Sequence, residues 1–121
     1  MQTFFCHRYA AHKMFTMSKS WEKIFYFATW LFQGSSYLSA RTYAIVHRMH
    51  HYYADTEEDV HSPKHDKGII KMMAKTRGIY YSILNKELKV ETRFLNDLPQ
   101  WDSFDKFAHH KATRFTWAFV Y

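Results

Sequence analysis

The chain has 121 residues, enough for one domain at most, and it carries 9 histidines, 20% aromatic residues and a net charge of +6. Its 3 glycines and 2 prolines make turns scarce and favour helices. The single cysteine, Cys6, excludes a disulfide framework and a structural zinc site built on thiolates. The His-Glu-x-x-His and His-x-Glu patterns of zinc hydrolases and deaminases are also absent.

The first predicted element covers residues 1–15 and is the end of a helix that carries His7 and His12. A new helix is expected to start at the serines at positions 18 and 20, since serine is a frequent N-cap. Residues 24–40 contain no formal charge, but a Gln-Gly-Ser-Ser segment interrupts their apolar run. A membrane-spanning helix needs ~20 mostly apolar residues, so we expect this stretch to lie along a membrane interface.

Two further helices are predicted in the middle of the chain, over residues 39–51 and 67–84. An acidic loop at residues 55–59 follows the first of them. In the second helix, helical spacing places four side chains on one apolar face: Ile69, Met73, Tyr80 and Leu84.

The second of these helices also carries lysines at intervals of four residues: Lys67, Lys71 and Lys75. Such a basic stripe suits contact with an anionic partner, such as lipid phosphate, the phosphates of coenzyme A or an acidic protein. The plain alternative is an ordinary solvated face.

The last part of the chain is predicted to form a short helix that opens at Leu98 and includes Phe104 and Phe107. Residues 115–121 form an apolar run that is predicted to enter a membrane span. Between these segments, His109 and His110 are expected at the surface, facing solvent or lipid headgroups.

The most informative feature is the clustering of the histidines. His47-Arg48-Met49-His50-His51 places three imidazoles within five residues, and on a helix these three share one face. His7 and His12 are five apart, about 140° around a straight α-helix, so they converge only near a helix end or around a second metal. Two such clusters suit two ions of Zn, Cu, Fe or Ni. The plain alternative is a basic helical face with incidental histidines.

These clusters resemble the histidine boxes of membrane fatty acid desaturases. His7-Arg8-Tyr9-Ala10-Ala11-His12 is similar to the first box, His-Arg-x-x-x-His with local variation. The cluster at residues 47–51 is similar to the second box, His-Arg-x-His-His. Residues 53–63 look like the stretch that follows box two, Thr-x-x-Asp-Pro-His-Ser, with Val60 in place of the usual proline. The resemblance extends over essentially the whole chain and is closest to bacterial acyl-CoA Δ9 desaturases.

The resemblance implies two iron ions held by five histidines: His7, His12, His47, His50 and His51. It implies an oxygen-dependent enzyme that inserts a cis double bond into a fatty acyl-CoA or acyl-lipid, with electrons from a cytochrome b5-like or ferredoxin-like donor. Asp55, Asp59 and His61 are candidates to orient the ligand imidazoles, or they belong to a solvated loop. Arg8 and Arg48 are expected to be structural and to pair with nearby carboxylates.

The implied fold is mainly α: a fragment of a helical integral-membrane desaturase, with helices on the cytoplasmic side and an interfacial amphipathic helix. Only 34 residues separate His12 from His47, too few for two membrane crossings, so both boxes are expected on one side of the membrane. Basic residues near the boxes favour the cytoplasmic face. The third family box, His-x-x-His-His, is missing, because Lys106 stands where its first histidine would precede His109. Residues 1–121 are therefore expected to be a partial desaturase domain that is inactive alone.

Two other functions stay open at this stage. A hydroxylase or ketolase of the same superfamily would use the same boxes to insert oxygen instead of a double bond. A non-catalytic, basic, aromatic-rich module for binding membranes or nucleic acid is the alternative from another class. We favour the desaturase, with membrane lipid and no nucleic acid among its partners.

Overall fold

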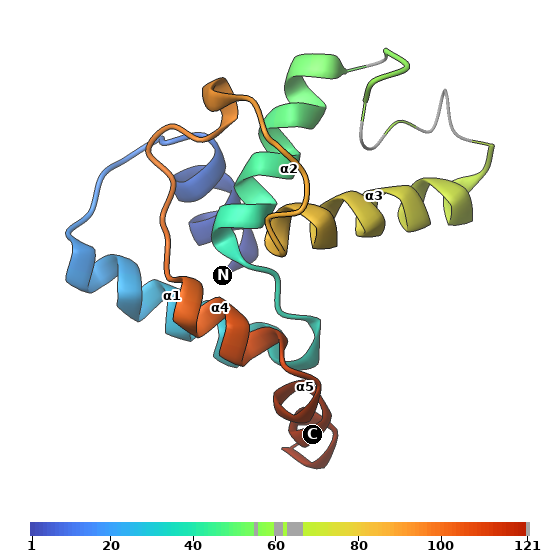
Figure 1. Ribbon diagram of the computed structural model, residues 1–121. Helices are drawn as coiled ribbons and strands as arrows, with labels where there is room; N and C mark the ends of the chain where they lie inside the picture. The colour runs from blue at the N-terminus through green and yellow to red at the C-terminus, as the bar shows by residue number, and fades with distance from the viewer. Residues whose placement is uncertain (55, 60–61, 63–66, 121) are drawn as a thin grey trace.

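The computed structural model describes residues 1–54, 56–59, 62 and 67–120, and every regular element in these ranges is a helix. The prediction of a mainly α fold is confirmed. The elements in chain order are η1 (Gln2–Ala11), α1 (Lys19–Gln33), η2 (Gly34–Ser36), α2 (Ala40–Tyr53), α3 (Ile69–Leu84), η3 (Thr92–Phe94), α4 (Asp102–His109) and α5 (Lys111–Val120). In Figure 1, α2 stands at the centre, with η1 on one side and α3 on the other.

Serine side chains start two of the α-helices. Ser18 is the N-cap of α1 and its hydroxyl accepts a hydrogen bond from the Trp21 N–H at 3.4 Å, so the second predicted serine lies inside the helix. Ser39 caps α2 in the same way, through the Thr42 N–H at 3.4 Å. These bonds satisfy backbone donors that the first turn of a helix leaves without partners.

Two hydrophobic clusters fix the position of α2. The first joins η1, α1 and α2 through buried residues that include Phe5, Tyr26 and Ala44. The second joins α2, α3 and η3 through Ile45, Ile83 and Phe94. Because α2 contributes to both clusters, it sets the distance between η1 on one face and α3 on the other.

Aromatic side chains pack α1 against the two last helices. The Trp30 ring lies 5.7 Å from the Phe107 ring of α4 and 5.0 Å from the Trp117 ring of α5. The other side of α1 exposes a stripe of large apolar side chains, which includes Trp21, Ile24 and Leu31. The interfacial position of this helix stays a prediction, and within the described ranges no helix combines the length and the apolar character that crossing a membrane requires.

The predicted apolar face of α3 is partly wrong. The structure buries Met72, Tyr80 and Ile83, whereas Ile69 and Met73 are exposed. The reason is visible in Figure 1: the C-terminal half of α3 packs beside α2, and its N-terminal half extends away from it. The helix begins at Ile69, so the predicted lysine stripe also loses its first member, which precedes the helix.

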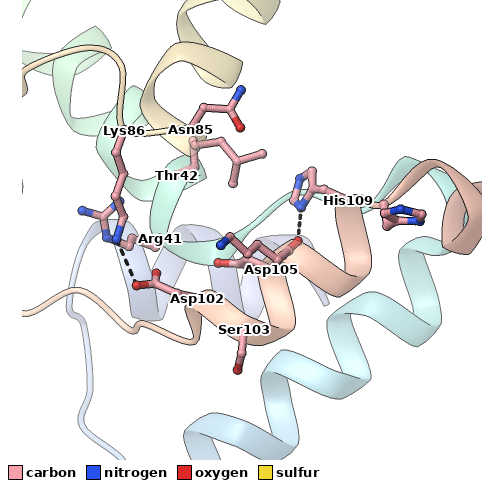
Figure 2. A pocket seen from close by; sticks show the side chains of 11 residues that line it. Arg41, Thr42, Asn85, Lys86, Asp102, Ser103, Asp105 and His109 are labelled. Carbon is pink, nitrogen blue, oxygen red and sulfur yellow. Dashed lines mark hydrogen bonds and ion pairs between the residues drawn. The ribbon is translucent and has the colours of Figure 1, made fainter.

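A buried hydrogen-bond network ties α4 to α3 and to the start of α2. Asp105 accepts hydrogen bonds from the hydroxyls of Tyr37 (2.8 Å) and Ser39 (2.7 Å). The Ser39 N–H donates to the Tyr80 hydroxyl, which lies 2.9 Å from His109 Nε2. His109 Nδ1 is 2.8 Å from the carbonyl oxygen of Asp105 (Figure 2). A carbonyl only accepts, so Nδ1 carries the proton and Nε2 accepts from Tyr80.

The expectation that His109 faces solvent or headgroups is therefore wrong, although its neighbour His110 is exposed. Burial lowers the pKa of His109, which agrees with a neutral ring in this network. Tyr80, which bonds to the His109 ring, is 29 residues away in the sequence, so no local pattern could predict this contact.

Replacing Tyr80 with phenylalanine should lower the free energy of unfolding by roughly 1–3 kcal/mol, because the Ser39 N–H and His109 Nε2 would both lose their partner. Urea unfolding followed by far-UV circular dichroism measures the loss. Tyr81→Phe is the matched control, since no hydrogen bond joins the Tyr81 hydroxyl to a described residue. Equal losses in both variants would contradict the role given to the Tyr80 hydroxyl.

Candidate metal centre

The first two candidate ligands, His7 and His12, are brought together by an unusual helix. The element η1 is a π-helix with hydrogen bonds between residues five apart, and the His12 N–H continues this pattern to the His7 carbonyl at 3.1 Å. The wider turn places the two side chains on one side of the element, with ring centroids 4.6 Å apart. Short π-helical segments frequently occur at functional sites. On an α-helix, residues five apart point in different directions, but the wider turn of the π-helix brings His7 and His12 to the same side.

The second cluster lies on α2, opposite the C-terminal end of η1. His47 and His51 are one helical turn apart, and their Nε2 atoms are 3.0 Å from each other. The Nε2 atom of His12 is also 3.0 Å from Nε2 of His47. His47 therefore stands between a neighbour on its own helix and a histidine from η1.

Three of these histidines converge closely enough to share one ion. A ligand nitrogen from each of His7, His12 and His47 lies within 4.8 Å of the other two. His51 adds a fourth imidazole through its contact with His47. Three of the five predicted ligands therefore converge on one point, and a fourth, His51, contacts one of the three.

Hydrogen bonding alone does not account for this arrangement. The Nε2 atom of His47 lies 3.0 Å from two other Nε2 atoms, but a ring nitrogen has either one proton to donate or one lone pair to accept with. A metal ion between the rings would instead accept lone pairs from neighbouring nitrogens at the same time. Metal–nitrogen bonds of about 2.1 Å place adjacent ligands of an octahedral ion about 3.0 Å apart.

The electrostatic environment favours the neutral imidazoles that a metal requires. Burial, followed by repulsion from the neighbouring histidines, lowers the pKa of His47 to about 4. Desolvation, with smaller contributions from His7, His51 and Arg48, also lowers the pKa of His12. Both rings are therefore deprotonated at neutral pH, with a lone pair for a cation. His7 Nδ1 is buried and has no hydrogen-bond partner among the described residues, as expected of a nitrogen that belongs to a metal site.

His50, the fifth predicted ligand, does not join this group. Its Nδ1 atom is 2.7 Å from Oδ1 of Asp59, a carboxylate that is 1% exposed. An imidazole that donates from Nδ1 to a carboxylate has its lone pair on Nε2, an arrangement that commonly orients a metal-binding histidine. Lys75 donates to the Asp59 carbonyl oxygen at 3.0 Å and so anchors the same loop from α3.

The remaining predicted residues are placed as follows. Asp55 and His61 lie outside the described residues. Lys67 and Lys71 are exposed, and their contact with an anionic partner stays a prediction. Lys75 differs from them, because its ammonium group holds the loop at Asp59.

An apolar cavity of about 1230 Å³ adjoins the histidines. His47 and His50 line it from α2, and α3 lines it with Met73, Ala74 and Gly78. The cavity therefore offers an apolar ligand a path along α2 and α3 to two of the candidate metal ligands.

Tyr43 also belongs to this site, although it is not among the residues predicted from the sequence. Its ring stacks on His47 with centroids 5.6 Å apart and an interplanar angle of 11°, and it also lines the apolar cavity. The signal was present, since Tyr43 precedes His47 by four residues and so shares its helix face.

A second cavity, of about 670 Å³, lies where α4 meets the start of α2 and the end of α3. Arg41, Lys86, Asp102 and Asp105 line it (Figure 2). Lys86 donates to Asp102 at 3.0 Å, and both oxygens of Asp105 accept from the network described above. Lys86, Asp102 and Asp105 are therefore already bonded to other groups of the protein.

No protein-family model, curated protein or solved structure matches this chain. The functional interpretation therefore depends on the residues and their geometry.

Proposed function

We propose that this chain supplies the metal-binding part of an oxygen-dependent fatty acyl desaturase. The observation that carries the proposal is the meeting of two sequence-distant histidine clusters, His7/His12 and His47/His51, around one point. Iron is among the metals that imidazole suits, and it is the metal that the resemblance implies.

The described histidines fit one metal position well and a second only in part. His7, His12 and His47 would hold the first ion, with His51 beside His47 as a further ligand, and His50, oriented by Asp59, would contribute to the second. Two bound irons would supply the oxidant that removes hydrogen from adjacent methylene groups of an acyl chain, which no amino-acid side chain can do.

The protein's own residues have three tasks in this proposal. The neutral imidazoles bind and orient the metal. Tyr43 holds the ring plane of His47 by stacking. The mainly apolar lining of the large, open cavity accepts the acyl chain next to His47 and His50. A fatty acyl-CoA or acyl-lipid is the proposed substrate, a cytochrome b5-like or ferredoxin-like protein the electron donor, and the cytoplasmic face of a membrane the location.

The first test is metal binding by the purified chain. Titration with Co²⁺ under anaerobic conditions, followed by visible absorption, should show one tightly bound ion per chain with nitrogen ligands. A second ion should bind more weakly, because among the described residues only His50 is prepared for it. A chain that takes up no Co²⁺ would support the non-catalytic module instead, and vesicle and nucleic-acid binding would then be measured.

The second test identifies the reaction. The gene, expressed with its neighbouring coding sequence in a host that lacks acyl desaturation, should yield acyl chains with a new double bond, detected by gas chromatography and mass spectrometry. Hydroxylated chains would support the hydroxylase alternative. If the protein binds metal but yields neither unsaturated nor hydroxylated chains, the metal site is supported and the desaturase proposal is wrong.

A further inference from the structure

The two histidine clusters each contain an arginine directly after their first histidine, and the structure treats these two arginines differently. Arg8 follows His7 and is exposed, and no hydrogen bond or ion pair joins its side chain to a described residue. Arg48 follows His47, is partly buried, and is surrounded by hydrogen-bond acceptors. Equal positions in similar motifs therefore have unequal roles in the fold.

Arg48 uses its guanidinium group to bind two separate segments. Nε donates to the Ala11 carbonyl at 2.9 Å and Nη2 to the Ala10 carbonyl at 3.0 Å. Nη1 donates to the carbonyls of Phe94 (3.2 Å) and Asn96 (2.6 Å). All four partners are backbone carbonyls, so the expectation that Arg48 pairs with a carboxylate is wrong.

The position of these carbonyls connects Arg48 to the metal centre. Ala10 and Ala11 end η1, and His12 follows them directly. The last carbonyls of a helix lack partners within it, and a cation there also meets the negative end of the helix dipole. The Arg48 side chain, adjacent to His47, thus donates hydrogen bonds to the backbone adjacent to His12.

We propose that Arg48 is a positioning residue of the metal centre, which fixes η1 and the turn at residues 92–96 against α2 so that His7 and His12 meet His47. This inference rests on the proposed metal site and goes beyond it by naming the residue that assembles it. Lysine can replace Arg48 only in part, because its three donors lie on one nitrogen and cannot reach all four carbonyls that the planar guanidinium group binds.

The test compares Arg48→Ala and Arg48→Lys with Arg8→Ala, using Co²⁺ as the probe and far-UV circular dichroism to verify helical content. Arg48→Ala should weaken Co²⁺ binding by about 10–100-fold, the range typical of losing a residue that orients metal ligands. Its absorption bands at saturating Co²⁺ should also shift, because the ligand geometry changes. Arg48→Lys should retain the fold and show a smaller defect of the same kind, whereas Arg8→Ala should match the wild type.

Chemical rescue separates positioning from a loss of stability. Low millimolar guanidinium ion should restore the Co²⁺ spectrum of Arg48→Ala by occupying the vacated space, and it should leave Arg8→Ala unchanged. Hydrogen exchange without metal should be faster at the amides of residues 5–14 in Arg48→Ala than in Arg8→Ala.

The outcomes distinguish this inference from the proposed function. If the wild type takes up no Co²⁺, the metal site itself is wrong and the positioning role falls with it. If the wild type binds Co²⁺, and folded Arg48→Ala and Arg48→Lys bind it with the same affinity and spectrum, the metal site stands and only the role of Arg48 is overturned.

Discussion

Replacing His47 with alanine is expected to weaken the binding of the first metal ion by more than about 100-fold, beyond the effect of losing a residue that only orients a ligand. Among the described histidines, His47 is the one whose Nε2 atom lies 3.0 Å from the Nε2 atoms of two others, His12 at the end of η1 and His51 on its own helix. Its removal takes away the ligand that lies between the histidines of η1 and His51. Equilibrium dialysis against Co²⁺, followed by metal analysis, measures the loss.

Two control variants make this result specific. His50→Ala should retain the first ion, because His50 is bonded to Asp59 and stands outside the group of converging histidines. His110→Ala should also bind normally, since this exposed histidine belongs to α4's C-terminal end. If His50→Ala loses the first ion as completely as His47→Ala, the division of the five histidines into four and one is wrong.

Local patterns were sufficient to predict the helices and the identity of the clustered histidines. The spacing of His47 and His51 places both rings on one face of α2, and the structure agrees. Ser18 and Ser39 cap helices because a short hydroxyl side chain satisfies the first backbone donors wherever the helix starts. Such features depend on residues within one or two turns, which a sequence displays directly.

Features that depend on distant partners were not predictable in the same way. The π-helical register of η1 brings His7 to His12, but no residue pattern specifies hydrogen bonds between residues five apart. His50 stands apart from the other histidines because its ring is hydrogen-bonded to the carboxylate of Asp59, nine residues later in the sequence. Arg48 bonds to carbonyls of η1 and of the turn at residues 92–96, and packing in the two hydrophobic clusters brings these segments close to it. In each case tertiary contacts override what the motif alone suggests.

The stability of the protein is expected to fall as the pH rises from about 4 to 6, through the ionisation of Asp105. Burial is the main cause that raises the pKa of this carboxyl from 3.8 to about 6, against the lowering effect of its bonds from Ser39 and Tyr37. The folded state therefore holds a proton that the unfolded chain releases at lower pH. The contribution is fully present below the unfolded pKa and is lost as the pH passes the folded pKa, a change of about 3 kcal/mol.

Asp105→Asn isolates this contribution, because an amide of the same shape does not ionise and the hydroxyls of Tyr37 and Ser39 can still pair with it. Urea unfolding at intervals from pH 4 to pH 7 should show the variant gaining about 2 kcal/mol relative to the wild type, which is most of the full contribution. The difference between the two proteins is the quantity to measure. The lowered pKa values of His12 and His47 act with the opposite sign, and they cancel because both proteins contain them.

Asp102→Asn provides the control on the same helix. Hydrogen bonds from Gln100 and then Lys86 lower the pKa of this exposed carboxyl, so its contribution is present at neutral pH and is lost on acidification. Asp102→Asn should change the free energy of unfolding only slightly, since exposed ion pairs contribute little. Its pH dependence should be opposite to that of Asp105→Asn. A difference between wild type and Asp105→Asn that stays constant from pH 4 to pH 7 would show that Asp105 ionises freely. The network that joins Tyr37, Ser39 and Asp105 would then be more hydrated than its geometry indicates.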